Sequence, residues 1–386
     1  MAFPENFLFG SATSAHQIEG GNINSDWYAW EQIPGHIRGG STSLIACDSW
    51  NKYNEDIKLL LNTNQNAYRM SIEWAKIEPE EGMFNKKAIN HCRKQFELLK
   101  KNNIKIMVTL FHFTLPQWVA KKDGFASKDN IKYFVRFCQK MAEEYKGSID
   151  FWATLNEPNV YVQKGYIEGS WCPGEKNKIK ALKSWSNFIK AHNLVYNAIK
   201  SVSPQTPIGP VVSTMVFKPY KNNILDRSLC YLARLFFYNA MLKRMAKKSD
   251  FIGLNYYLKT TLQAKNPIVV KDNSVQNDYG WHVHPEGIYE TIEECTKWGK
   301  PIYITENGLA DAKDRLRPQF LKDTFDWLQK AIADNLPIKG YFHWSLLDNF
   351  EWASGYTMKF GLHTIDRKPR PSAQIYAELI KKSSGN

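Results

Sequence analysis

The feature that most constrains the fold is a series of eight short apolar runs, which alternate with longer segments of helical periodicity. The runs are continuous and often β-branched, which is typical of strands that are buried on both faces of a parallel sheet. They occupy residues 7–12, 67–72, 104–110, 151–155, 208–212, 251–254, 302–305 and 340–344.

Between the runs, apolar residues recur every three or four positions, which predicts amphipathic helices. These segments are 87–101, 128–145, 180–201, 285–298 and 318–335. Eight strand–helix units of the α/β class favour one closed (β/α)8 barrel, a TIM barrel. An open doubly wound sheet would show the same alternation, but no G-x-G-x-x-G follows the first run.

The chain has 386 residues, which at about 150 residues per domain suggests two or three domains. Barrels of this length nevertheless form one core, so we expect a single (β/α)8 catalytic domain over residues 1–386. If it is a barrel, the chemistry belongs at the C-terminal ends of the strands. Six runs lead there into polar or aromatic groups, namely Gln17, His112, Asn156-Glu157, Asn255 with Tyr257, Glu306-Asn307, and Trp344.

Glu157 and Glu306 follow the fourth and seventh runs, and in a closed barrel both reach the same end. Two carboxyl groups that share a site cannot easily both ionise, so their pKa values separate. Glycoside hydrolysis needs such a pair, one protonated and one ionised. The alternative for either residue is a helix N-terminal carboxylate that interacts with the helix dipole.

Aromatic residues are abundant, with 13 Trp, 19 Tyr and 21 Phe. The segment 344–352 supplies Trp344, Glu351 and Trp352 within nine residues. Indole rings can pack on the C–H faces of a sugar while a carboxylate accepts from its hydroxyls. Both tryptophans are alternatively core residues.

The net charge is +13, but the Lys and Arg residues look dispersed, as in Lys100-Lys101 and Lys381-Lys382. We therefore expect no nucleic-acid partner. The sequence contains no stretch of about 18 apolar residues, so it predicts no membrane span. We therefore expect no membrane partner. The six cysteines form no CxxC motif, so free thiols and a cytoplasmic location are expected. His282-x-His284 lacks further ligands, so we expect no metal and no cofactor.

Ten segments, in order along nearly the whole chain, resemble glycoside hydrolase family 1, the retaining β-glycosidases with a (β/α)8 barrel. They are FLFGSATSAHQIEG (7–20), CDSWNKYNEDIKLL (47–60), YRMSIEWAKIEP (68–79), HFTLPQW (112–118), TLNEP (154–158), GLNYY (253–257), ITENG (304–308), GYFHWSLLDNFEWASGY (340–356), FGLHTID (360–366) and PSAQIY (371–376).

The resemblance implies that Glu306 is the nucleophile and Glu157 the general acid and base. Arg69 and Tyr257 would hold Glu306, although Arg69 could also form a core-capping salt bridge. The implied sugar-binding residues are Gln17, His112, Asn156, Tyr257, Trp344, Glu351 and Trp352. His112 could alternatively be a hydrogen-bonded core histidine, and Asn255 would support Tyr257.

Relatives that act on 6-phosphorylated sugars lack the carboxylate of Glu351 and carry Lys and Tyr where this chain has Met358 and Phe360. An unphosphorylated sugar is therefore favoured. The expected activity is hydrolysis of terminal non-reducing β-D-glucosyl residues of small β-glycosides or short oligosaccharides, with β-D-galactosyl or β-D-fucosyl residues as further substrates. The alternatives are a β-galactosidase, a transglycosylating member of the family, or a catalytically silent sugar-binding protein.

The chain is short for this family, and the shortest regions lie at 213–250 and 257–281. We expect trimmed loops there, on the leaving-group side, and an open cleft that accepts varied aglycones.

Overall fold

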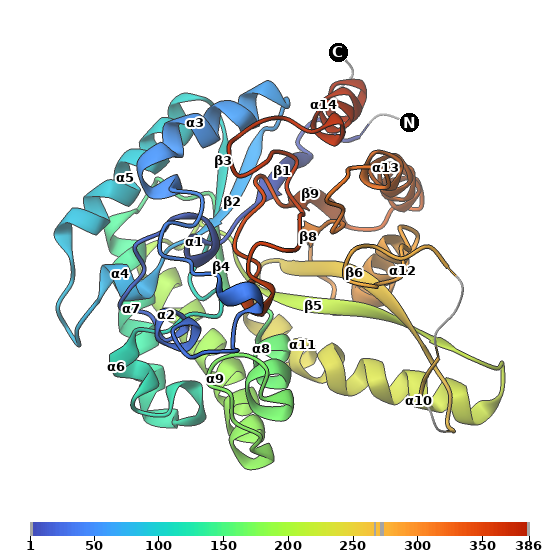
Figure 1. Ribbon diagram of the computed structural model, residues 1–386, viewed down its shortest axis with the longest axis horizontal. Coiled ribbons are helices and arrows are strands. Elements are labelled where there is room, and N and C mark those ends of the chain that lie inside the picture. The colour runs from blue at the N-terminus through green and yellow to red at the C-terminus, as the bar shows by residue number, and fades with distance from the viewer. Residues whose placement is uncertain (1–2, 266–267, 271–273, 384–386) are drawn as a thin grey trace.

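Eight parallel strands close into a barrel in the computed structural model, which describes residues 3–265, 268–270 and 274–383 (Figure 1). Each strand pairs with the next, and β9 returns to pair with β1. Each of the eight predicted runs corresponds to one of these strands to within a residue at the shared ends, apart from strand extensions. The strands are β1 Leu8–Ala12, β2 Ala67–Ser71, β3 Lys105–Thr109, β4 Phe151–Asn156, β5 Ile208–Pro219, β6 Ile252–Leu262, β8 Ile302–Asn307 and β9 Ile338–Trp344.

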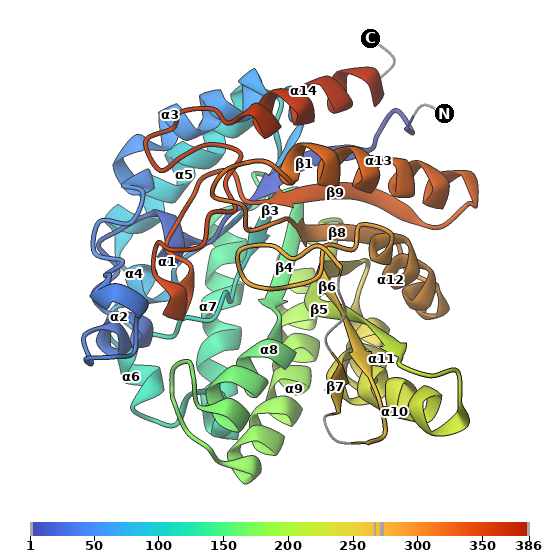
Figure 2. The same ribbon diagram turned by 45° about the vertical axis from the view of Figure 1, so that its right-hand side comes forward.

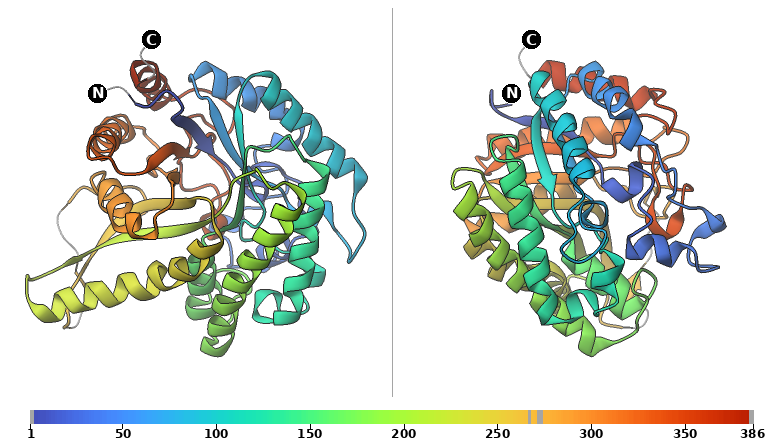
Figure 3. Two further views of the ribbon diagram at one scale, coloured as in Figure 1. Left: turned by 180° about the vertical axis from the view of Figure 1, so that it is seen from behind. Right: turned by 90° about the vertical axis from the view of Figure 1, so that its left-hand side faces the viewer.

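Helices cover the outside of the barrel, as the view from behind shows (Figure 3). The predicted helical segments correspond to α5 Lys86–Lys101, α7 Ile131–Glu144, α9 Lys178–Val202, α12 Gly287–Cys295 and α13 Arg317–Ala333. The other long helices are α3 Ser49–Asn62, α10 Ile224–Arg234 and α14 Pro371–Ser383, and the short ones include α1 Ala15–Ile18, α2 Asp26–Glu31, α4 Trp74–Ile77, α6 Gln117–Ala120, α8 Pro158–Val162 and α11 Ala240–Met245.

Helix α5 illustrates how the local sequence sets these elements. The side chain of Asn85 accepts hydrogen bonds from the backbone N–H groups of Lys87 and Ala88, which caps the first turn. Lys100 and Lys101 lie in the last turn, where cations interact favourably with the helix dipole. The apolar face between these ends, which includes the fully buried Phe96, packs into the core between helices and strands.

The N-terminal end of the barrel interior is filled with aromatic side chains. Phe151 and Phe251 lie edge to face with Tyr303, at ring-centre distances of 5.3 and 5.4 Å. This plug closes one end of the barrel with apolar side chains, so the polar groups inside the barrel gather at the other end.

Strands β5 and β6 are longer than predicted and run on past the barrel rim (Figure 2). Val216–Pro219 pairs with Lys259–Leu262, and the short strand β7 Val269–Val270 adds to β6 in antiparallel orientation. The sequence predicted ends at residues 212 and 254 because Ser213 and Asn255 are polar, but the ladder continues past a register shift after Thr214. Much of 213–250 and 257–281, where we expected trimmed loops, therefore forms strands and helices.

The two ends of the described chain lie side by side (Figure 1). The N–H of Phe3 donates to the carbonyl of Ser383 at 3.3 Å. None of the helices in the described part of the chain is long and apolar enough to cross a membrane.

Candidate active site

Glu306 is held at both carboxylate oxygens at the end of β8. Arg69, from the middle of β2, places Nη1 2.5 Å from Oε1, and the hydroxyl of Tyr257 donates to Oε2 at 2.7 Å. Arg69 is fully buried and also donates to the carbonyl of Thr305 and to Thr109 Oγ1. The guanidinium is therefore fixed by neighbouring strands, and it fixes the carboxylate in turn.

Glu157 lies at the end of β4, directly before α8, in a left-handed conformation with φ 43°. This region is unfavourable for a residue that has a Cβ, and such strain concentrates at functional sites. Asn255 Nδ2 donates to Glu157 Oε1 at 2.9 Å. Among the residues that the structure describes, no Lys or Arg forms an ion pair with Glu157.

An amide network connects the two carboxyl groups. Asn156 Oδ1 accepts from Arg69 Nη2 at 2.6 Å and from Asn255 Nδ2 at 3.1 Å. Arg69 also donates to Glu306 and Asn255 to Glu157, so a chain of hydrogen bonds through Asn156 links the two carboxyl groups. Asn255, which the sequence predicted as a support for Tyr257, thus contacts Glu157 directly.

The two glutamates differ in their ionisation. Burial, and then the negative charge of Glu306, raises the pKa of Glu157 to about 8. Burial also raises the pKa of Glu306, but Arg69 and the hydroxyl of Tyr257 oppose that rise. Of the two acids, Glu306 is the one that forms an ion pair within the described part of the chain, so the shared negative charge resides on Glu306 and the proton on Glu157.

Gln17, Glu351 and Trp344 meet beside this pair. Gln17 Nε2 donates to Glu351 Oε2 at 3.3 Å and is anchored by Asn349 Oδ1 and the carbonyl of Phe350, both at 2.9 Å. The indole N–H of Trp344 favours the ionised form of Glu351, which places the two side chains close together. Burial and the charge of Glu306 raise the pKa of Glu351 to about 8. The structure thus brings together side chains from β9, α1 and the segment after β9.

His112 lies close to two tryptophans. Its ring is nearly parallel to those of Trp344 and Trp352, at ring-centre distances of 5.9 and 6.1 Å. Its Nε2 is 3.2 Å from Asn156 Nδ2, while its buried Nδ1 has no hydrogen-bond partner among the described residues. Burial and Arg69 hold the pKa of His112 well below its usual range, so the ring is neutral.

Two aromatic residues that the sequence did not single out complete the site. Tyr279 and Trp281 stack at 4.4 Å with planes 6° apart. Trp281 also lies 6.0 Å from Tyr257 and 6.4 Å from Phe360. No apolar run or motif marks this segment, since it lies in the connection between β7 and α12. Only its spacing of two aromatic residues around Gly280 could have suggested a role.

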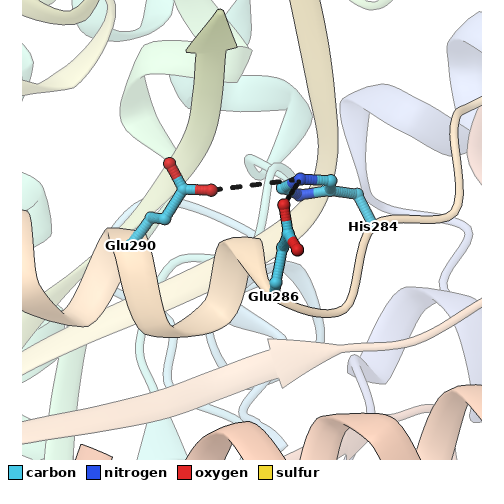
Figure 4. A group of neighbouring side chains, drawn as sticks. All are labelled: His284, Glu286 and Glu290. Atoms are coloured by element: carbon cyan, nitrogen blue, oxygen red, sulfur yellow. Dashed lines mark hydrogen bonds and ion pairs between the residues drawn. The ribbon is translucent and has the colours of Figure 1, made fainter.

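The two histidines of the His282-x-His284 pair have separate partners. His282 Nδ1 lies 2.5 Å from Ser274 Oγ. His284 instead groups with Glu286 and Glu290 at the start of α12, as Figure 4 shows, with Nε2 2.7 Å from Glu286 Oε1. His and Glu can hold a metal ion, but Glu290 is already paired with Lys218 at 2.6 Å and His284 Nδ1 lies 2.9 Å from the hydroxyl of Tyr256. Each of the three side chains in this group therefore already has a hydrogen-bond or ion-pair partner.

Comparison with known proteins gives one consistent result. The model of a family described as Glycosyl hydrolase family 1 matches residues 1–231 and 231–384. A 1,4-beta-D-glucan glucohydrolase of Thermotoga neapolitana is 30% identical over 439 aligned residues, which cover 99% of this chain and 98% of that protein. A beta-galactosidase of Pyrococcus woesei is 28% identical, with 98% and 97% covered.

The same similarity extends to a solved structure. The beta-glucosidase from Thermotoga maritima in complex with glucoimidazole superposes with a TM-score of 0.95 at 29% identity, and 99% of each chain is covered. The 439 positions aligned with the Thermotoga neapolitana enzyme exceed the 386 residues of this chain. That relative therefore carries residues that are missing here.

Proposed function

Because the chain belongs to glycosyl hydrolase family 1, we propose that it hydrolyses terminal non-reducing β-D-glucosyl residues with retention of configuration. The observation that carries this proposal is the asymmetry of the acid pair: Glu306 is held by Arg69 and Tyr257, whereas Glu157 contacts a neutral amide. A retaining glycosidase needs one ionised and one protonated carboxyl group in this arrangement.

In the first step, a carboxylate oxygen of Glu306 attacks the anomeric carbon from the side opposite the leaving group. The bond between that carbon and the glycosidic oxygen breaks as Glu157 donates its proton to the oxygen. The products are a covalent α-glycosyl ester of Glu306 and the free alcohol. Arg69 helps by stabilising the negative charge of Glu306 before the attack.

In the second step, water attacks the anomeric carbon and Glu157, now ionised, accepts its proton. The ester bond to Glu306 breaks and the carboxylate returns to Arg69. Two inversions give a product with the original β configuration. Asn156 is suited to contact the 2-hydroxyl, since it is held beside both acids by Arg69 and Asn255.

Recognition of the sugar is assigned to Gln17, His112, Glu351, Trp344 and Trp352. Glu351 accepts from hydroxyl groups, and the neutral ring of His112 lies beside Asn156 through its Nε2. Met358 and Phe360 line the neighbouring segment with apolar side chains. A phosphate at the 6-position would meet no cation among these residues, which favours an unphosphorylated sugar.

Galactosides are a second substrate candidate, because one of the similar proteins is named a beta-galactosidase. Glucose and galactose differ only in the orientation of the 4-hydroxyl. A cytoplasmic location is also proposed, and the six free, buried cysteines support it.

The test is a panel of p-nitrophenyl β-D-glucoside, β-D-galactoside and β-D-fucoside, with the released sugar followed by proton NMR. We expect the highest kcat/KM on the glucoside and the β-anomer as the first product. First release of the α-anomer would overturn retention. No turnover of any glycoside would instead identify a sugar-binding protein that lacks catalysis.

A further inference from the structure

A surface outside the active site carries exposed apolar side chains on α10 and on the helical turn Leu235–Asn239 that follows it. Leu225, Leu232 and Phe236 are 67%, 44% and 71% exposed. Their spacing of seven and four places them on one face of this helix, next to Tyr231. No described element covers this face, and patches of this kind mark interaction sites.

The same surface continues across a groove to the first turns of α9. The groove has a volume of about 930 Å³, and its lining includes Ile167, Leu182, Trp185 and Phe236. Leu182 is 71% exposed, and α9, α10 and α11 lie along the same edge of the molecule (Figure 2). We call this surface, formed by α10, the turn after it and the groove, the apolar-basic face.

Its charge is as unusual as its apolar content. Residues 176–249 contain 14 Lys and Arg but only one acidic residue, Asp226, which is buried. The rest of the chain then has 37 residues of each sign, so this stretch accounts for the whole net charge of +13. The excess of cations over carboxylates is therefore confined to one part of the chain, although 37 of the 51 Lys and Arg residues lie outside it.

Several of these cations border the groove. Lys178, Lys243, Arg244 and Lys247 line it, and Arg244 lies over the ring of Trp185 at 5.1 Å. Within the described ranges, none of these four forms an ion pair. A row of unpaired cations around apolar side chains is complementary to a surface that is negatively charged outside and apolar beneath.

We propose that the apolar-basic face docks on an anionic lipid bilayer. A second copy of the chain fits less well, because a two-fold contact would bring the two cationic rims together. A nucleic acid would use the cations but leave Leu225, Leu182 and Leu232 against a charged backbone. A bilayer accommodates both, with the apolar side chains below the headgroups.

This mode of binding needs no membrane-spanning helix. The expectation of no membrane partner was based on the absence of an apolar stretch long enough to span a bilayer, so it does not apply to surface binding. It also has a consequence for the site. α8 starts directly after Glu157, and Asn159 of that helix lines the groove. The docked surface therefore borders the catalytic end of the barrel.

The test is flotation of the full chain with vesicles of phosphatidylcholine alone, or of equal parts phosphatidylcholine and phosphatidylglycerol. We expect binding to the anionic vesicles that weakens as salt rises. Lys243→Glu with Lys247→Glu should weaken it at least tenfold, since each lysine near an anionic surface contributes roughly a factor of five. Leu182→Ser with Phe236→Ser should weaken it by a similar factor.

Matched controls use equally exposed residues elsewhere. Ile45 and Met83 are 71% and 64% exposed, so Ile45→Ser with Met83→Ser, and Lys381→Glu with Lys382→Glu on α14, should leave vesicle binding unchanged. All variants should keep the turnover of an aryl glucoside, which shows that they fold. No binding to anionic vesicles, equal loss in the controls, a dimer that the Leu182 and Phe236 changes disrupt, or salt-sensitive binding to RNA without vesicle binding would each overturn the proposal.

Discussion

At the scale of single residues, the site shows how two identical side chains acquire opposite tasks from their neighbours. Glu306 has a guanidinium at one oxygen and a phenol at the other. Glu157 is buried beside that negative charge, and its hydrogen bond comes from an amide instead of a cation. The motifs identified both residues, but their ionisation depends on Arg69, which lies more than two hundred positions from Glu306 in the chain.

Replacement of the nucleophile should be recoverable by a small anion. Glu306→Ala should lose hydrolysis of an aryl β-glucoside by a factor of at least 10⁴, because no ester can form. Azide should restore turnover by direct attack from the vacated side, and NMR should identify the α-glycosyl azide. Glu306→Gln is the matched control, since its amide still fills the space. Recovery of β-azide from the alanine variant would contradict the assigned role.

The raised pKa of Glu157 predicts the alkaline side of the pH profile. Glu157 must be protonated to act as an acid, and its pKa is about 8. kcat/KM should therefore fall tenfold per pH unit above that value. Glu157→Gln, measured with a dinitrophenyl glucoside that needs no acid, should lack this descent. An unchanged descent in the variant would assign the titration to another group, such as Glu351.

At the scale of elements, the sequence predicted the regular parts of the fold well. Each apolar run became a strand because a parallel strand covered on both faces needs continuous apolar residues. Two features were not predictable in this way. The extensions of β5 and β6 pair outside the barrel through mixed residues such as Lys218 and Thr260, so no apolar run marks them. Tyr279 and Trp281 reach the site through chain connections that carry no periodic pattern.

The first residue of helix α13 forms a buried network of polar contacts. Arg317 is fully buried, pairs with Asp314, and donates to the carbonyls of Leu309, Asp311 and Lys359. The helix thereby fixes the segment after β8 to the segment that carries Phe360. Such a network leaves several polar groups unpaired if one partner is removed.

Arg317→Gln should therefore lower the free energy of unfolding by about 3–5 kcal/mol, because Asp314 would remain buried without its cation. Urea denaturation followed by tryptophan fluorescence measures the change. Arg315 is exposed two residues earlier, and Arg315→Gln should change stability by less than about 0.5 kcal/mol. Equal effects of the two substitutions would show that the buried network contributes little.

At the scale of the whole molecule, one end of the barrel is packed for stability and the other end carries the chemistry. The aromatic plug of Phe151, Phe251 and Tyr303 fills the N-terminal end of the barrel, and the acids occupy the other end. The polar strand ends could be recognised from the sequence because parallel strands of a barrel all finish at the same end. Which of these side chains form hydrogen bonds with one another could be established only from the three-dimensional structure.

The excess of positive charge in residues 176–249 contributes a permanent dipole moment to the molecule. The positive pole lies on the side of α9, α10 and α11, and α3 and α5 lie on the opposite side (Figure 1). Above a negatively charged plane, such a dipole experiences a torque as well as an attraction. Molecules adsorbed on a cation-exchange resin would therefore share one orientation, with α3 and α5 facing the solvent.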